Sequence, residues 1–372
     1  MMKATEKITA LQATALLMLA IMPTGLLYLP AIVTKIAAQD AWISVLVSLL
    51  LGLGLAFYIG YLTLQNPGMS FIRWIESRLG RIAALIIGLF LTKYYVSVSA
   101  VALQEFSTFI ADEILQRTPV FIIVSIVMIV VLYAVYHGLE TIARVTLIVF
   151  FLNVVLTFIG LLLLGKDLHF AYLLPVGEKP VPVILKGSIS PFIWLTEVAV
   201  LLIIGPFLNK KQYLMRTSVT GVLLAGTWNV LLVMLAILIF GPKLVQLVAY
   251  PSFAVVSLVE IGNFLERLEI VFISLWITTM YVKIALFMFA ASHCLNDLFR
   301  IENKLPIQLG LGLFTLMTAL YSWDNTADFS EFMRLAGPPH LFLANIAIPL
   351  LLGIALWFMK RTAHRRGEQN DG

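Results

Sequence analysis

Four ionisable side chains lie well inside stretches of the sequence that are otherwise apolar: Lys93, Glu105, Glu197 and Lys283. If each stretch crosses a membrane as a helix, a rise of ~1.5 Å per residue places Glu197 and Lys283 near the bilayer centre and Lys93 within about a turn of it. The same spacing places Glu105 roughly 13 Å nearer the outer face, where we expect it to reach water. A charge at the centre of a span costs ~2.5–3.5 kcal/mol on insertion scales, and pairing Glu197 with a lysine would offset much of this.

These central charges have two interpretations. In the functional interpretation, Lys93, Glu197 and Lys283 line a polar cavity and tune ligand binding or carry protons, which is the usual role of ionisable residues inside a membrane. In the structural interpretation, Glu197 and one lysine form an ion pair that fixes helix packing. Lys93 then extends its stem so that its ammonium reaches the inner headgroups. Which lysine pairs with Glu197 stays open at this stage.

Polar and aromatic residues gather at the depth of these charges, together with a Pro-Thr-Gly sequence in the first apolar stretch. Sites for small ligands combine apolar walls with a few placed polar groups, although serine and threonine also hydrogen-bond between helices. An unwound helix at Pro23–Gly25 would expose N–H groups that suit a carboxylate, so an amino acid or similar zwitterion is the expected ligand. The predicted ligand-binding residues are Pro23, Thr24, Gly25, Tyr94, Tyr95, Ser97, Trp194, Glu197, Trp276 and Thr279.

The elements that must position these residues are membrane-spanning helices. Of the 372 residues, 61% are hydrophobic and only 12% charged, whereas soluble domains are near a quarter charged. This composition excludes a cytosolic enzyme, a disordered regulator and a secreted domain. Ten stretches are long and apolar enough to cross a bilayer. They are 10–36, 41–64, 82–111, 119–136, 141–165, 187–208, 216–241, 268–296, 305–323 and 339–359.

The loop charges predict the orientation of these spans. An even number of spans places both termini on one side, where fifteen of the loop lysines and arginines fall, against eight on the other. The positive-inside rule therefore predicts that both termini are cytoplasmic. The net charge of +5 is divided among short clusters between apolar runs, so no nucleic acid partner is expected.

Two segments between the spans are expected to lie at the membrane surface. Residues 66–81 mix aromatic and aliphatic residues with charges, as a short helix at the inner headgroups would. Residues 243–267 are apolar but interrupted by Pro251, and we expect them to fold partly over the outer face. The alternative for 243–267 is a re-entrant segment or an eleventh span.

The ten spans divide into two halves of five, as in transporters built from inverted repeats. We expect one membrane domain over 1–372, with repeats at about 8–165 and 184–360 and a short basic tail at 361–372. Spans 3 and 8, equivalent in the two halves, are the longest. Spans 1 and 6 are also equivalent, and both carry proline and glycine: Pro23-Thr24-Gly25 in span 1, and Gly187 to Pro191 and Gly205-Pro206 at the ends of span 6. Both helices are predicted to break there, although such residues often produce only a kink.

Features typical of catalysis or of a resident metal are missing from the sequence. Cys294 is the single cysteine, the five histidines are scattered, and HExxH, Walker-type and GxSxG sequences are absent. We therefore expect no enzyme activity, no metal and no cofactor.

Several short sequences resemble one known family. They are Ile8-Thr9-Ala10-Leu11-Gln12, the apolar run to Leu29-Pro30, Ala38-Gln39-Asp40-Ala41-Trp42-Ile43-Ser44, and Asn263-Phe264-Leu265-Glu266-Arg267-Leu268-Glu269 leading to Trp276. With a glutamate in the middle of span 6, they resemble the B subunits of spore germinant receptors, the GerAB-type germination permeases. The resemblance extends over essentially the whole chain.

The resemblance implies the LeuT/APC-like fold of the amino acid–polyamine–organocation transporters, with ten helices in a 5+5 inverted repeat. It also implies residence in the spore inner membrane, assembly with A and C subunits, and a nutrient bound between span 1 and spans 3, 6 and 8. By position, the nutrient-binding residues that the resemblance implies for this chain are Pro23, Thr24, Gly25, the Tyr94–Ser97 region, Glu197 and Thr279. Members often have glycine before the span 6 glutamate, whereas Leu195-Thr196 stand here, which places the pocket shape in question.

Three functions are therefore compared. The first is a receptor subunit that binds a small nutrient, an amino acid in the first instance, and triggers germination. The second is a proton-coupled amino acid transporter of the same fold, in which Lys283 acts as a built-in cation where related transporters bind sodium. The third is an ion or water conduit that opens during germination.

Overall fold

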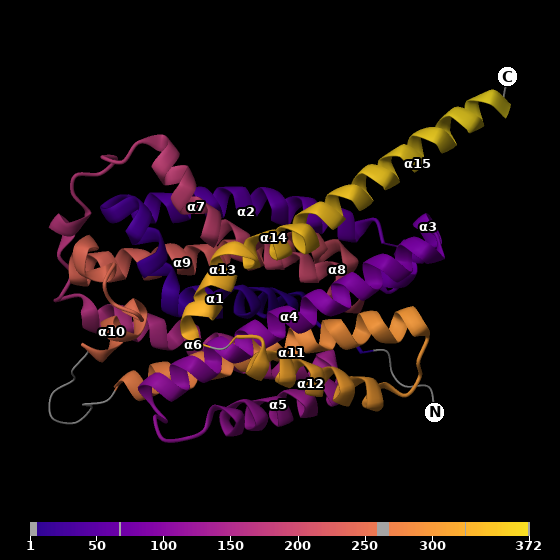
Figure 1. The fold of residues 1–372 in the computed structure, drawn as a ribbon. Helices are drawn as coiled ribbons and strands as arrows, with labels where there is room; N and C mark the ends of the chain where they lie inside the picture. The colour runs from indigo at the N-terminus through magenta and orange to yellow at the C-terminus, as the bar shows by residue number, and fades with distance from the viewer. Residues whose placement is uncertain (1–5, 67, 259–267, 324, 371–372) are drawn as a thin grey trace.

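The computed structural model describes residues 6–66, 68–258, 268–323 and 325–370 and consists of helices lying side by side (Figure 1). Each of the ten predicted spans coincides with helical structure in this part of the chain. The spans are α1 (Ala10–Ala37), α2 (Ala41–Leu64), α4 (Arg81–Glu113), α5 (Val120–His137), α6 (Leu139–Leu164), α7 with α8 (Val181–Leu195, Leu201–Ile204), α9 (Leu214–Val245), α11 (Leu268–Phe299), α12 (Lys304–Tyr321) and α14 with α15 (Gly337–Phe342, Ile348–Asn370).

Eight helical stretches of the described residues are long and apolar enough to cross a membrane. The first, Ala10–Leu64, contains two of the predicted spans, α1 and α2, joined by a 3-10 turn at Ala38–Asp40. The short helix α12 falls outside the eight. The predicted all-helical membrane architecture is therefore confirmed.

The N-terminal motif Ile8 to Gln12 starts the first span. Thr9 accepts a hydrogen bond from the Gln12 backbone N–H, and the Gln12 side chain accepts one from the Thr9 N–H, which forms a capping box. Ile8 donates to Phe207 O at 2.9 Å, and its own carbonyl accepts from Asn209 N at 3.0 Å. The start of span 1 is thereby fixed to the end of span 6.

The predicted break in span 1 is not present, because α1 is helical from Ala10 to Ala37 with Pro23 and Pro30 inside it. Proline in a membrane helix is tolerated where neighbouring groups satisfy the backbone that it disturbs. The carbonyl that Pro23 leaves without its helical donor is that of Leu19, four residues earlier. The Trp276 indole contacts α1 at Pro23 itself, where it donates to Pro23 O at 3.3 Å. Helix α1 therefore offers no half-helix N-terminus at Pro23–Gly25 in this conformation.

Span 6 does change its geometry, as predicted, but in its middle. Helix α7 ends at Leu195, the chain continues as a 3-10 helix over Thr196–Val200, and α8 follows. A stretch of 3-10 helix inside a longer helix often marks a functional hinge. The change from α-helix to 3-10 helix therefore lies around Glu197, and not at the glycine and proline residues near the two ends of the span.

Contacts between the helices repeat in matched pairs, as two halves of related structure require. The equivalent helices α2 and α9 pack together, and so do α4 and α11. The contact of α1 with α9 is matched by that of α7 with α2, and α4 with α12 is matched by α11 with α5. This pattern agrees with the predicted 5+5 inverted repeat, while the repeat limits 8–165 and 184–360 stay a prediction.

The third helices of the two halves are long, as predicted, with 33 residues in α4 and 32 in α11. Helix α9 also has 32 residues, but it turns sharply at Gly241, where φ is 71°. Because this positive φ and Pro242 interrupt the helix, its straight part is shorter than α4 and α11.

Both segments expected at the membrane surface contain short helices. In α3 (Phe71–Leu79) the apolar side chains of Phe71, Ile72, Trp74 and Ile75 are buried against the bundle. Helix α10 (Pro251–Ser257) packs on α1, α9 and α11, so this segment folds over the bundle as predicted. Residues 259–267, which include most of the Asn263–Glu269 motif, lie outside the described part. Helix α13 (Thr326–Leu335) was not predicted.

The Gln-Asp-Ala-Trp motif, Gln39 to Trp42, connects two turns at one end of the bundle. Asp40 is fully buried and accepts hydrogen bonds from the backbone N–H groups of Gly177 at 2.8 Å and Lys179 at 2.9 Å. Gln39 also contacts Glu178 through its amide. The motif therefore fixes the loop after α6 onto the turn between α1 and α2.

The N-terminal end of α1 and the C-terminal end of α15 lie at the same end of the bundle, and α15 extends beyond the other helices (Figure 1). This placement agrees with an even number of spans. The cytoplasmic orientation of that end stays a prediction.

Candidate functional site

A buried ion pair lies at the centre of the bundle. The Lys283 ammonium lies 3.0 and 2.9 Å from the two carboxylate oxygens of Glu197, and it donates to Thr24 Oγ1 at 2.9 Å. The side chains of Lys283 and Glu197 are 2% and 3% exposed. These three contacts use all three protons of the ammonium, so the pair is fully hydrogen-bonded on the lysine side.

Three separate helices supply this site. Thr24 comes from the middle of α1, Lys283 from the middle of α11, and Glu197 from the 3-10 segment of span 6. A 3-10 helix has about 3.0 residues per turn against 3.6 in an α-helix, so it turns the side chains that follow α7 to a different angle. The geometry of Glu197 therefore depends on the local winding of span 6.

A small cavity of about 40 Å³ adjoins the ion pair. A water needs roughly 10–15 Å³ of such space, so the cavity holds about three waters and is too small for an amino acid. The structure is thus closed around the pair. Of the predicted site residues, Thr24, Ser97, Trp194, Glu197 and Lys283 line this central cavity.

Asn345 is a central polar residue that the sequence did not reveal. Its amide donates to Tyr94 Oη at 2.7 Å and to Thr196 Oγ1 at 3.1 Å, and its side chain is 2% exposed. Asn345 lies in a π-helical turn, Leu343–Ala347, between α14 and α15. Such π-helical turns often occur at functional sites. In the sequence, the one feature that could have indicated Asn345 was an asparagine inside an otherwise apolar span.

A second missed residue, Asn229, faces Gly25. A Cβ added at Gly25 would lie 3.1 Å from Asn229 Oδ1 and 3.6 Å from Trp194 Cε3. Asn229 is 1% exposed, and neither atom of its amide has a hydrogen-bond partner among the described residues. Gly25 is therefore a point of close approach between α1 and α9 rather than a wall of the central cavity.

Four other predicted site residues have packing contacts and do not line the central cavity. The Pro23 carbonyl and the Trp276 indole bond to each other, and Thr279 donates to Trp276 O within its own helix at 2.7 Å. Tyr95 stacks on Phe287 with ring centroids 5.8 Å apart. Tyr94, in contrast, reaches the cavity indirectly, because its ring stacks on the cavity residue His340 at 5.4 Å.

The structure corrects two expectations about charges. Lys93 is exposed, and its ammonium lies 3.4 Å from His340 Nδ1 rather than beside Glu197. Glu105, expected to reach water, is 1% exposed. The surrounding helices cover the Glu105 side chain. The position of a residue along its own helix gives its depth in the membrane but not its burial by other helices.

An aromatic layer separates the ion pair from the end of the bundle that carries α10. Trp276 stacks on Phe106 at 5.8 Å and meets Phe109 edge-on at 4.8 Å, and Phe109 contacts Tyr250 at 5.1 Å. Tyr250, in the connection before α10, donates to Asp112 Oδ2 at 3.1 Å. Burial and the nearby Asp112 carboxylate raise the pKa of Tyr250 to about 12, so the phenol stays a donor at neutral pH.

The described residues contain no group of three or more histidine, cysteine, aspartate or glutamate side chains placed to hold a metal ion. What the centre of the bundle offers instead is the Glu197 carboxylate and the Lys283 ammonium, with the buried carboxyl of Glu105 close enough to interact with both of them. Hydroxyl, amide and aromatic groups surround these charges. This set can bind a small polar molecule.

Comparison with known sequences identifies relatives over most of the chain. The model of a family described as "Spore germination protein" matches residues 7–327. Spore germination protein KB of Bacillus subtilis (strain 168) is 25% identical over 352 residues, which cover 90% of this chain and 91% of that protein. Spore germination protein XB of Bacillus anthracis is 24% identical over 319 residues, 85% of this chain and 86% of that protein.

Solved structures share the fold at low sequence identity. MhsT in complex with L-phenylalanine has a TM-score of 0.63 and 13% identity, over 92% of this chain and 86% of MhsT. A Na⁺-coupled sialic acid symporter has a TM-score of 0.61 and 12% identity, over 92% of this chain and 79% of the symporter. The fold is thus LeuT/APC-like. Because the family model covers most of its length, the chain belongs to the spore germination protein family.

Proposed function

We propose that this chain is the membrane subunit of a nutrient germinant receptor in the spore inner membrane, and that it triggers germination when an amino acid binds at Glu197 and Lys283. The observation that carries the proposal is the buried ion pair, which adjoins a cavity at the point where span 6 changes from α-helix to 3-10 helix.

The charges of the pair favour a zwitterion. The ammonium of an amino acid can replace Lys283 at the Glu197 carboxylate, and its carboxylate can replace Glu197 at the Lys283 ammonium. Every buried charge then keeps a partner of opposite sign. A ligand with only one charge would separate the pair and leave one partner uncompensated, which costs ~3–5 kcal/mol for buried groups.

Binding at this position supplies a means of signalling. The central cavity of about 40 Å³ must widen to admit an amino acid, so Lys283 must move relative to Glu197 and Thr24. These residues belong to α11, span 6 and α1, so the widening changes the arrangement of three helices. A ligand shifts such an equilibrium only by binding one state more tightly than the other, and here it binds only the wider state.

The exposed Lys93 supports assembly with partner subunits. It lies on α4, a membrane span, among exposed apolar residues such as Ile86 and Leu89. An ammonium at this depth is unstable against lipid. We propose that the A and C subunits of the receptor cover this face and supply an acceptor for Lys93, and that the basic end of the chain faces the spore core.

Direct binding tests the proposal. The purified chain in lipid nanodiscs is titrated calorimetrically with a panel of amino acids, each compared with the amine that lacks its carboxylate and the acid that lacks its ammonium. For alanine these are ethylamine and propionate. We expect at least one amino acid to bind about 100-fold more tightly than both of its analogues. Equal binding of the amine or the acid would refute the zwitterion site.

Variants connect this binding to the pair. Glu197→Gln is expected to abolish amino acid binding while the protein still inserts into the membrane. The matched control is Glu140→Gln, which removes an exposed ion pair with Arg144 four residues away on α6. Binding that survives in Glu197→Gln would remove this carboxylate from the site.

Transport by the same site is the second candidate function. The observation that favours it is the contact of the Lys283 ammonium with Thr24 of α1, which places a fixed cation between spans 1 and 8 of a transporter fold. Proteoliposomes with the isolated chain and a pH gradient distinguish the candidates. Concentrative uptake of labelled amino acid would overturn the receptor proposal in favour of a transporter, and steady ion or water flux without substrate would indicate a conduit.

A further inference from the structure

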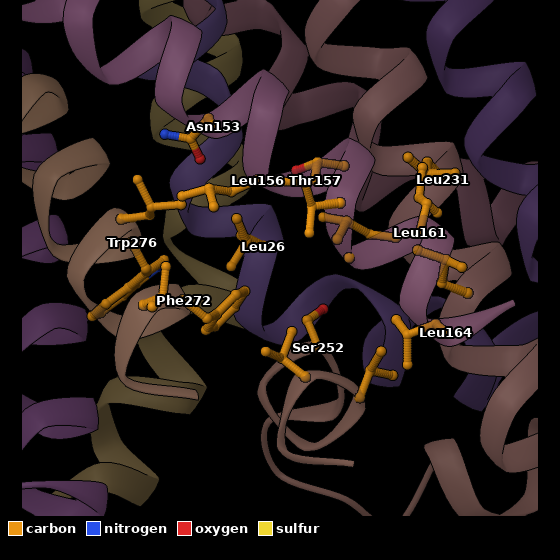
Figure 2. Close-up of a pocket in the computed structure, with 18 of the residues that line it drawn as sticks. Leu26, Asn153, Leu156, Thr157, Leu161, Leu164, Leu231, Ser252, Phe272 and Trp276 are labelled. Carbon is orange, nitrogen blue, oxygen red and sulfur yellow. The ribbon is translucent and has the colours of Figure 1, made fainter. Parts of the chain in front are cut away.

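A second and larger cavity of about 140 Å³ lies to the side of the central cavity (Figure 2). It is enclosed by α6, α9, α10 and α11, with Leu26 of α1 at its inner wall. We call it the lateral cavity. Trp276 forms part of its wall, and the same indole donates to Pro23 O. The Glu197–Lys283 pair is not among the residues that line it.

The walls of the lateral cavity are almost entirely aliphatic and aromatic. Leucine side chains from α6 and α9, among them Leu156, Leu161 and Leu231, surround the hollow in Figure 2, and Phe272 closes one side. Within the described part of the chain, no charged side chain lines the cavity. A charged ligand would therefore be buried without a partner, so the cavity suits an uncharged molecule.

A few polar groups on these walls have unused hydrogen-bonding capacity. Ser252 of α10 is 4% exposed, and its hydroxyl points into the hollow in Figure 2. Neither Ser252 Oγ nor the indole nitrogen of Trp228 has a hydrogen-bond partner among the residues described. Asn153 and Thr157 of α6 also line the cavity. Since buried polar groups are normally hydrogen-bonded, this wall is suited to a ligand that carries a polar group.

The size and rim of the lateral cavity limit what can enter. An engineered protein cavity of about 150 Å³ binds benzene, so a volume of 140 Å³ accommodates a molecule of similar size. Ile159 and Val271 at the rim are 43% and 37% exposed, and the outward face of α6 carries further exposed apolar residues such as Phe158. Because α6 and α11 are membrane spans, molecules reach this rim from the hydrocarbon of the bilayer.

We propose that the lateral cavity is a binding site for an uncharged, membrane-soluble molecule of about benzene's size with one hydroxyl group, and that Ser252 hydrogen-bonds this hydroxyl. The aliphatic walls hold the apolar body, and Ser252 selects an alcohol or phenol over the hydrocarbon of the same shape. This site does not depend on the ligand proposed for Glu197 and Lys283.

Phenol and benzene are the probes that test this site, because they differ by one hydroxyl. Each is titrated into the purified chain in detergent micelles by calorimetry, with the heat of protein-free micelles subtracted. We expect saturable binding of both, with phenol tighter by about 2- to 12-fold, the range that one hydrogen bond contributes. Ser252→Ala is expected to reduce this ratio to about one.

Filling the cavity provides the second variant. Gly160 lines the cavity, and a Cβ added there has no heavy atom within 4 Å. Gly160→Leu is therefore the variant chosen to fill the hollow. It should weaken phenol binding at least about 10-fold. Gly54→Leu on α2 is the control, because Gly54 also has open space around an added Cβ but lies away from the cavity. Three results would overturn the proposal. They are undiminished phenol binding in Gly160→Leu, the absence of saturable phenol binding to the unmodified chain, and a ratio of phenol to benzene affinity that Ser252→Ala leaves unchanged.

Discussion

The ion pair between Glu197 and Lys283 can be removed one partner at a time. Glu197→Gln leaves the Lys283 ammonium 2% exposed, with the neutral oxygens of Thr24 and the new glutamine as hydrogen-bond acceptors but without the charge of its carboxylate partner. Lys283→Met leaves the Glu197 carboxylate buried without the ammonium. Removing one member of a buried pair costs ~3–5 kcal/mol because the remaining charge has lost its compensation. We therefore expect each single variant to lower the free energy of unfolding by about this amount.

The double variant Glu197→Gln/Lys283→Met has neither charge and nearly the original volume. Replacing a buried pair by neutral groups is often neutral or stabilising, so the free energy of unfolding should return close to that of the unmodified chain. The four proteins form a double-mutant cycle. Because each single variant is expected to lose ~3–5 kcal/mol and the double variant almost nothing, the expected interaction energy between the two sites is ~6–10 kcal/mol. Unfolding in mixed detergent micelles, followed by circular dichroism, supplies the four free energies. The exposed pair Glu140–Arg144 is the control cycle, where ~0.3–0.5 kcal/mol is expected.

The same cycle separates the structural interpretation of the pair from the functional one. If the pair only fixes helix packing, the double variant recovers stability and retains amino acid binding. If the pair is the ligand site, the double variant recovers stability but does not bind. Single variants that lose less than about 1 kcal/mol would refute the reasoning altogether, because they would mean that neither charge depends on the other.

Three further predictions concern residues around the pair. Gly25→Leu should destabilise the chain by about 1–3 kcal/mol, because the new side chain begins 3.1 Å from Asn229 Oδ1 where α1 and α9 approach closely. Unfolding in detergent measures this loss against the control Gly54→Leu, and equal stability of the two variants would contradict it. Asn345→Leu should lower the free energy of unfolding by about 1–3 kcal/mol, because Tyr94 and Thr196 lose a buried hydrogen-bond donor. A loss no greater than in the control Asn209→Leu, at an exposed position after span 6, would show that this network contributes little. Asp40→Ala should speed amide hydrogen exchange in residues 170–179, because the backbone N–H groups of Gly177 and Lys179 lose their hydrogen-bond acceptor. Mass spectrometry measures this exchange, and an unchanged rate would contradict the role given to the Asp40 motif.

The sequence was sufficient to predict the spans and several of the central residues. Apolar stretches of about twenty residues are a local property of the chain, so composition alone identifies membrane helices. Glu197 and Lys283 were recognisable because a charge inside such a stretch is costly and requires a compensating environment. The depth of a residue in the membrane follows from the constant rise per residue of its helix. This was enough to place Thr24, Ser97 and Trp194 at the same depth as the buried charges.

What only the tertiary structure decided is the direction in which each side chain points. The rotation of one helix against another is set by packing between segments far apart in sequence, so depth alone did not distinguish Lys283 from Lys93 as the partner of Glu197. The same holds for Asn345, whose bonds to Tyr94 and Thr196 require a π-helical turn. It also holds for Pro23, because α1 stays helical from Ala10 to Ala37 past this proline, packed against segments far away in the sequence such as that of Trp276.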